Sequence, residues 1–213
     1  MDFIPTIPVL AAFAAAALAL TVTPGPDMTL FLGKAVTQGR AAGMAALLGA
    51  STGLLVHTTL AAVGLSALLA ASATAFLVLK IVGALYLLWL AVEAIRHGSG
   101  LNLQQAASRG EPLVRVYLKG LGVNLLNPKI IMFFVTFLPQ FVDAGDPDAA
   151  GKLLFLGALF VAICTPICAL MIASASRLSG WLHRSPRVMR AVDWVFAGVF
   201  GAFAVRLLLA RGQ

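Results

Sequence analysis

Residues 18–32 read LALTVTPGPDMTLFL, and residues 121–137 read LGVNLLNPKIIMFFVTF. In both stretches a short polar segment that contains proline interrupts a long apolar run. Proline lacks a backbone hydrogen-bond donor and pushes the preceding residue out of helical geometry. Gly25-Pro26 and Asn127-Pro128 each fit a helix cap followed by proline at the first helical position. The two stretches therefore predict two helices that stop and start again in the middle.

The chain as a whole is strongly apolar. Of its 213 residues, 61% are hydrophobic and 11% are charged, and the mean hydropathy is +0.98, whereas about a quarter of residues are charged in soluble domains. This composition excludes a water-soluble globule. Because a helix needs about 20 residues to cross the hydrocarbon layer, we predict an all-α integral membrane protein with a single domain over residues 1–213. Its six spans are expected at about 8–32, 43–68, 73–95, 117–142, 152–176 and 191–210.

The predicted loops carry most of the charge, and the balance of 15 Lys and Arg against 8 Asp and Glu gives a net charge of +7. No basic stripe interleaved with aromatic residues is present in the sequence, so a nucleic-acid partner is not expected. The cations follow the first, third and fifth spans, and the positive-inside rule then places both termini outside the cytoplasm. These cations are Lys34, Arg40, Arg96, Arg109, Arg115, Arg177, Arg184, Arg187 and Arg190, and the acidic loop on the other side has Asp143, Asp146 and Asp148.

Six spans with this alternation give two halves of three spans in opposite orientation, which is the arrangement of transporters built from inverted repeats. A shift of 102 residues superposes Pro26, Asp27 and Phe31 on Pro128, Lys129 and Phe133. The breaks in the first and fourth helices therefore correspond. We expect them to meet near the middle of the membrane, facing inward, because irregular backbone is not tolerated against lipid.

Asp27 and Lys129 have opposite charges and follow the two prolines. Helix N-termini bind carboxylates, Lys129 adds a cation, and Asp27 offers a partner for an ammonium group. The pattern predicts a site for a zwitterion, of which a free amino acid is the simplest. The alternative is that Asp27 and Lys129 neutralise each other as a structural pair. The predicted substrate-binding residues are Asp27, Lys129, Asn127 and Gly25, and the helix breaks are at Pro24, Pro26 and Pro128.

His57 lies near the middle of the second predicted span, on a face whose other members are small. A stripe of small residues indicates close helix packing, and His57 on the same face is expected to point into the bundle. It is a candidate proton relay with Asp27, since imidazole titrates near neutral pH; the alternative is a neutral histidine bonded to a backbone carbonyl. The stripe consists of Ala41, Ala45, Gly49, Gly53 and His57.

Other residue types add candidates and exclusions. Tyr86 and Asn124 are candidates for lining the cavity. Cys164 and Cys168, the only cysteines, lie in one apolar run and are interpreted as packing residues, so neither a disulfide, a metal site nor a cofactor is predicted. Phe133, Phe137 and Phe141 recur every four residues and are expected to contact core or lipid rather than substrate.

Three segments resemble a known family: TPGPDM at residues 23–28, KIVGALYL at 80–87 and NLLNPKIIMFFVTFLPQF at 124–141. The sequence is similar over nearly its whole length to amino-acid exporters of the LysE/RhtB type. The resemblance implies six spans, location in the bacterial inner membrane and export of amino acids or close derivatives driven by the proton motive force. The expected partners are an amino acid, protons and membrane lipid, with a homo-oligomer left open.

Two other functional classes are compatible with parts of the sequence. Residues 49–53, GASTG, match the G-x-S-x-G pattern of a serine hydrolase with Ser51 as nucleophile. That pattern requires a strand-to-helix turn, whereas these residues belong to a helical stripe, so an enzyme is not expected. A passive channel or a structural membrane subunit is the other alternative.

Overall fold

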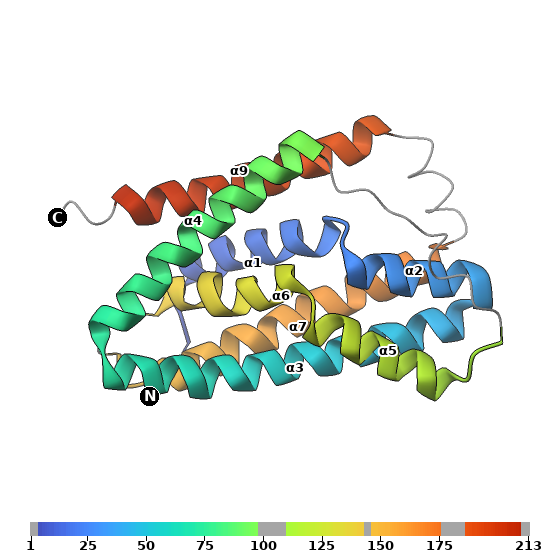
Figure 1. The fold of residues 1–213 in the computed structure, drawn as a ribbon, viewed down its shortest axis with the longest axis horizontal. Helices are drawn as coiled ribbons and strands as arrows, with labels where there is room; N and C mark the ends of the chain where they lie inside the picture. The colour runs from blue at the N-terminus through green and yellow to red at the C-terminus, as the bar shows by residue number, and fades with distance from the viewer. Residues whose placement is uncertain (1–3, 98–109, 143–145, 176–185, 210–213) are drawn as a thin grey trace.

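The computed structural model describes residues 4–97, 110–142, 146–175 and 186–209, and within these ranges every regular element is helical. The elements in chain order are α1 (Ile7–Val22), α2 (Pro26–Gln38), α3 (Arg40–Ala71), α4 (Ala73–His97), α5 (Leu113–Leu125), α6 (Pro128–Met132), the π-helix η2 (Phe133–Phe137), the 3₁₀ helix η3 (Leu138–Phe141), α7 (Ala149–Ala173) and α9 (Pro186–Leu209). In Figure 1, α4 and α9 lie side by side along one edge of the bundle.

The two proline-containing breaks are where the sequence predicts them. α1 and α2 meet at an angle of 53°, and α5 meets the segment from Pro128 to Phe141 at 50°. Gly25 caps α2 and Asn127 caps α6, and each is followed by proline at the start of the helix. The Asn127 side chain accepts a hydrogen bond of 3.1 Å from the Lys129 backbone N–H. The predicted caps are confirmed.

Several helices are suited to a membrane. In the described residues, α3 and α7 are each long and apolar enough to cross, and each bent pair becomes a third and a fourth such span if it is counted as one. Exposed apolar side chains cover these helices, among them Leu60, Val63 and Leu170, as expected for surfaces that contact lipid. The arrangement of six spans as inverted repeats stays a prediction. Arg109, Asp143, Arg177 and Arg184, which enter the charge argument, lie outside the described residues.

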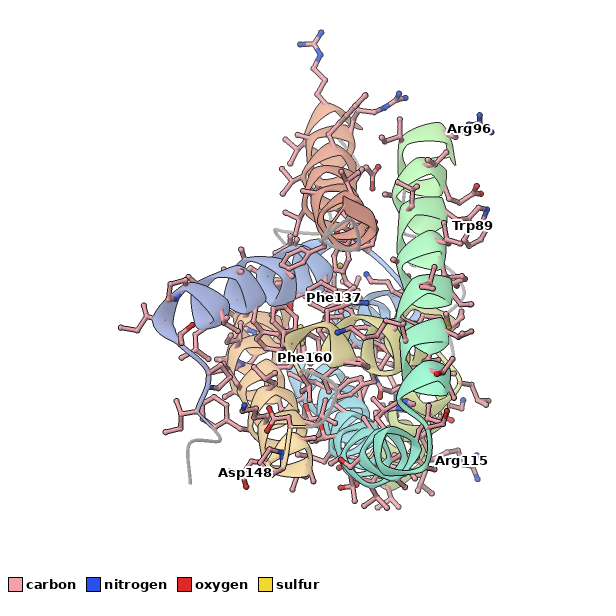
Figure 2. The ribbon with its side chains drawn as sticks, turned by 90° about the vertical axis from the view of Figure 1, so that its left-hand side faces the viewer. Trp89, Arg96, Arg115, Phe137, Asp148 and Phe160 are labelled. Carbon is pink, nitrogen blue, oxygen red and sulfur yellow. The ribbon has the colours of Figure 1, made fainter. Side chains whose placement is uncertain are left out.

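An aromatic core fills one end of the bundle. Phe133 and Phe137 are fully buried. The centroid of the Phe133 ring lies 4.7 Å from that of Phe160, and the centroid of the Phe137 ring lies 4.8 Å from that of Phe203. Figure 2 shows Phe137 and Phe160 inside the bundle, whereas Trp89 lies on the outer side of α4. The phenylalanine stripe therefore belongs to the core. A second, smaller cluster lies toward the other end, on α2, α3, α5 and α7.

Glycines allow α3 to approach α5 closely. A Cβ atom on Gly49 would lie 2.0 Å from the Tyr117 carbonyl oxygen, and one on Gly120 would lie 2.1 Å from the carbonyl oxygen of Ala46. Both distances are too short for a side chain, so the two backbones touch. The close packing predicted from the small-residue stripe is confirmed, and its partner is α5 of the same chain.

The placement of Lys34 differs from the sequence prediction. The sequence predicts a loop here, after the first span, but α2 continues to Gln38 and the Lys34 side chain is only 2% exposed. Its ammonium group is buried against Glu111, a residue 77 positions away. The physical reason is an ion pair between distant segments, for which the local sequence gives no signal.

Candidate functional site

The two helix breaks meet at one cavity. Lys129, just after the second break, donates a hydrogen bond of 2.7 Å from Nζ to the carbonyl oxygen of Thr23 at the first break. A Cβ atom on Gly25 would lie 3.6 Å from the same Nζ, so the Lys129 side chain passes directly over that glycine. The cavity has a volume of about 50 Å³ and is also lined by α3 and α7; its lining includes Leu20, Thr21, Met28, Phe31, Leu54, Ile130, Phe160, Cys164 and Cys168.

Asp27 is held by two amides from the other break. Asn124 Nδ2 donates to Asp27 Oδ2 at 2.8 Å, and Asn127 Nδ2 donates to the same oxygen at 3.0 Å. Asn124 lies in the last turn of α5 and Asn127 caps α6, so the two amides approach Asp27 from either side of the second break. The contacts fix the carboxylate through one oxygen only. Among the described residues, neither Asp27 Oδ1 nor Asn124 Oδ1 has a hydrogen-bond partner, although both atoms are buried.

Asp27 and Lys129 share the cavity without forming a direct ion pair. Nζ of Lys129 bonds to the Thr23 carbonyl and lies 5.7 Å from the centre of the Phe196 ring. The carboxylate of Asp27 faces the two amides instead. The two side chains therefore line the same space without a direct contact.

His57 contacts Asn124 rather than Asp27. Its Nε2 lies 3.4 Å from the Asn124 backbone carbonyl oxygen, and its ring stacks on Phe134 with 5.6 Å between centroids. A Cβ atom on Gly53, one turn before His57, would lie 2.4 Å from Asn124 Oδ1, so the Asn124 side chain fills the space of that glycine. This geometry matches a histidine held by a backbone carbonyl, and the relay between His57 and Asp27 stays a prediction.

Two further sequence candidates, Tyr86 and Ser51, differ in their position relative to the cavity. Tyr86 is on α4, with its ring 5.4 Å from that of Trp89, and it does not line the cavity, because α4 packs along α9 and η2 outside the helices that enclose it. Ser51 does line the cavity, but it lies inside α3 and its Oγ is 3.1 Å from Thr165 Oγ1. A helical serine paired with a threonine lacks the turn that a hydrolase nucleophile requires.

Sequence reasoning did not single out three features of the cavity. Thr23 contributes its backbone carbonyl, which no side-chain pattern reveals. Cys164 and Cys168 line the cavity from α7 with their sulfur atoms 3.8 Å apart; their spacing of four residues placed them on one helix face, but nothing indicated which face. In the described part of the chain, no group of three or more His, Cys, Asp and Glu residues gathers in a way suited to a metal ion.

Comparison with known proteins identifies the family. The model of the LysE type translocator family matches residues 18–211, so the chain belongs to that family. It is a membrane transporter rather than an enzyme. No solved structure matches the chain.

Named relatives are similar over almost their whole lengths. The homoserine/homoserine lactone efflux protein of Salmonella typhimurium is 31% identical over 195 residues, which are 90% of this chain and 92% of the relative. The leucine efflux protein of Enterobacter sp. is 27% identical, with 88% and 89% covered. The threonine efflux protein of Salmonella typhi is 28% identical, with 89% and 92% covered.

Proposed function

We propose that this protein is a secondary active exporter of amino acids or close derivatives across the bacterial inner membrane, and that it holds its substrate between Asp27 and Lys129. The observation that carries the proposal is the half-satisfied carboxylate of Asp27. One oxygen accepts from two amides, and the other is buried without a partner among the described residues. A buried acceptor of this kind is costly unless a donor reaches it.

The amino end of the substrate belongs at Asp27. An ammonium group has three N–H donors and a positive charge, which match the unpartnered Oδ1 atoms of Asp27 and Asn124. The amides of Asn124 and Asn127 hold the carboxylate in place before the substrate arrives. Preorganisation of this kind reduces the ordering cost of binding.

The carboxyl end belongs at Lys129. Its ammonium group is at the cavity, where it donates a hydrogen bond to a neutral backbone carbonyl, that of Thr23. A substrate carboxylate is a stronger acceptor for Nζ than that carbonyl, because charge-assisted hydrogen bonds are about twice as strong as neutral ones. The first turn of α2 adds backbone N–H groups and the positive end of a helix dipole.

Transport requires the cavity to open to each side in turn. We propose six spans, α4 and α9 included, in two antiparallel halves that rock about the breaks. By the positive-inside rule, α2 ends and α5 begins on the cytoplasmic side, and both termini are periplasmic. The halves carry one broken helix each, which is the feature that supports this arrangement.

Coupling to protons is proposed at Asp27. Protonation of its carboxylate from the periplasm would compete with the substrate ammonium and favour release on that side. His57 remains the candidate relay, although Asn124 lies between the two residues. An exporter of this type moves substrate against its gradient and stops when a protonophore collapses the proton gradient.

The test is export of homoserine, threonine and leucine from cells that express the parent, Asp27→Asn or Lys129→Met at matched membrane abundance. We expect the parent to lower the intracellular pool of at least one of them, with both variants impaired. A pool that only equilibrates, and is insensitive to a protonophore, would show a passive channel instead. Unchanged export in both variants would remove the site.

A further inference from the structure

Glu111 joins the cytoplasm-directed halves of the two broken helices. Its Oε2 lies 2.8 Å from Lys34 Nζ on α2, and its Oε1 lies 2.5 Å from Lys119 Nζ on α5. Gln38, at the end of α2, donates from Nε2 to the Glu111 carbonyl oxygen at 3.2 Å. Glu111 stands two residues before α5, so its contacts with Lys34 and Gln38 cross from one half-helix to the other.

The ion pair of Lys34 and Glu111 lies between the cavity and the cytoplasm-directed ends of α2 and α5. Asp27, Met28 and Phe31 line the cavity from the first turns of α2, and Lys34 follows Asp27 by seven residues, or about 10 Å of helical rise. The α5 segment likewise reaches the cavity at its far end, through Asn124. While Lys34 and Glu111 are paired, α2 and α5 are held together on the cytoplasm-directed side of the cavity.

The opposite end of the cavity is closed in a different way. There, apolar aromatic side chains of α1, η2, α7 and α9 pack in one continuous cluster. Toward Lys34 the apolar cluster is smaller, and the outer contact is between charges. Separated aromatic rings gain nothing from water, whereas separated Lys and Glu side chains regain their hydration. A buried ion pair is therefore a weak source of net stability but a contact that can open into water.

The two lysines that pair with Glu111 differ in their exposure to solvent. The Lys34 and Glu111 side chains are 2% and 7% exposed, whereas Lys119 is 47% exposed. Lys119 and Glu111 belong to the same segment, so their pair moves with α5 when α5 moves. Of these two ion pairs, the one with Lys34 must break when α2 and α5 separate, as must the hydrogen bond from Gln38 to the Glu111 carbonyl.

We infer that Lys34 and Glu111 form the inner gate of the transport pathway, closed in this structure, and that the cavity opens toward the cytoplasm only when they part. The inference rests on the proposed function, because it assumes that substrate enters this cavity. Cys164 and Cys168 give a built-in reporter, since both thiols line the cavity and a maleimide adds to a thiol without any leaving group.

The experiment measures labelling of these two cysteines by a charged, membrane-impermeant maleimide in inside-out and right-side-out vesicles, read by intact mass. In Glu111→Gln and Lys34→Met we expect the labelling rate in inside-out vesicles to rise about 5- to 150-fold, the range of typical couplings between sites. Lys34→Arg, which keeps the ion pair, and Lys119→Gln, which removes only the partner within the α5 segment, should label at the parental rate. A variant with both cysteines replaced by alanine should show no label.

Equal acceleration in Lys119→Gln, or acceleration from both faces of the membrane, would show general loosening and overturn the gate. Unchanged labelling in both Glu111→Gln and Lys34→Met would also overturn it. Labelling does not depend on transport. If the gate variants label as expected while the parent exports no amino acid, the proposed function fails and the gate assignment stands.

Discussion

Replacing Asp27 by asparagine isolates the charge at the site from its shape. The side-chain carbonyl of asparagine can still accept from the amides of Asn124 and Asn127, which both bond to Asp27 Oδ2. The variant therefore keeps the contacts that position residue 27 between the two breaks. What it loses is the negative charge and the acceptor at Oδ1, the atom without a partner among the described residues.

The magnitude follows from the lost bond. A hydrogen bond to a charged group contributes about 1.5–3 kcal/mol, and about 1.4 kcal/mol corresponds to a tenfold change in affinity. We expect Asp27→Asn to weaken the apparent affinity for the transported amino acid by about 10- to 150-fold. The dependence of export on external pH should be lost as well, because the proposed protonation site is gone.

The assay is counterflow of a labelled amino acid into proteoliposomes that contain the purified protein, over a range of substrate concentrations and pH values. Asp148→Asn is the matched control, because Asp148 stands just before α7, makes no side-chain cap bond and does not line the cavity. It should bind substrate with parental affinity. An Asp27→Asn protein that is folded and retains parental affinity would refute the assignment of the ammonium group to Asp27.

Three further predictions follow from particular contacts. Lys129→Met should raise the half-saturating substrate concentration about tenfold or more in the same assay, because the cation for the substrate carboxylate is lost while the apolar stem is kept; an unchanged value would place the carboxylate elsewhere. Gly49→Ala should destabilise the protein by about 1–3 kcal/mol, seen as a lower midpoint of thermal unfolding in detergent, because its Cβ would lie 2.0 Å from the Tyr117 carbonyl oxygen. Gly64→Ala, on the same helix, is the control: its Cβ would have no described neighbour within 4 Å, so this change should be neutral or stabilising. Hydrogen bonds from Lys119 and Lys34 lower the pKa of Glu111 from 4.5 to about 2. The stability that the Glu111 carboxylate contributes should therefore be complete above pH 4.5 and fade as the pH falls toward about 2. The difference in unfolding midpoint between the parent and Glu111→Gln should shrink over that interval, and a difference that grows there would contradict the ion pair.

The helix breaks were predictable because their causes are local. Proline at the first helical position and a glycine or asparagine cap act within a few residues, and both appear in the structure as the sequence indicates. The packing of the glycine stripe was predictable for a related reason, since a small side chain permits contact whatever its partner. The identity of the partner helix, α5, could be learned only from the three-dimensional structure.

The details of the site were beyond local reasoning. The approach of Asn124 and Asn127 to one oxygen of Asp27 joins residues about a hundred positions apart. Tyr86 is not among the residues that line this cavity, and its position is hard to predict because an apolar helix in lipid gives no periodic signal of its rotation. The burial of Lys34 is not predictable from the nearby sequence, because its partner, Glu111, is 77 positions away along the chain.

The site is tested most directly by a structure of the protein with its transported amino acid bound. We predict the substrate nitrogen within hydrogen-bonding distance of Asp27 Oδ1 and the substrate carboxylate at Lys129 Nζ, between the two helix breaks. An amino acid bound outside this cavity, with no contact to Asp27 or Lys129, would contradict the assignment of the site.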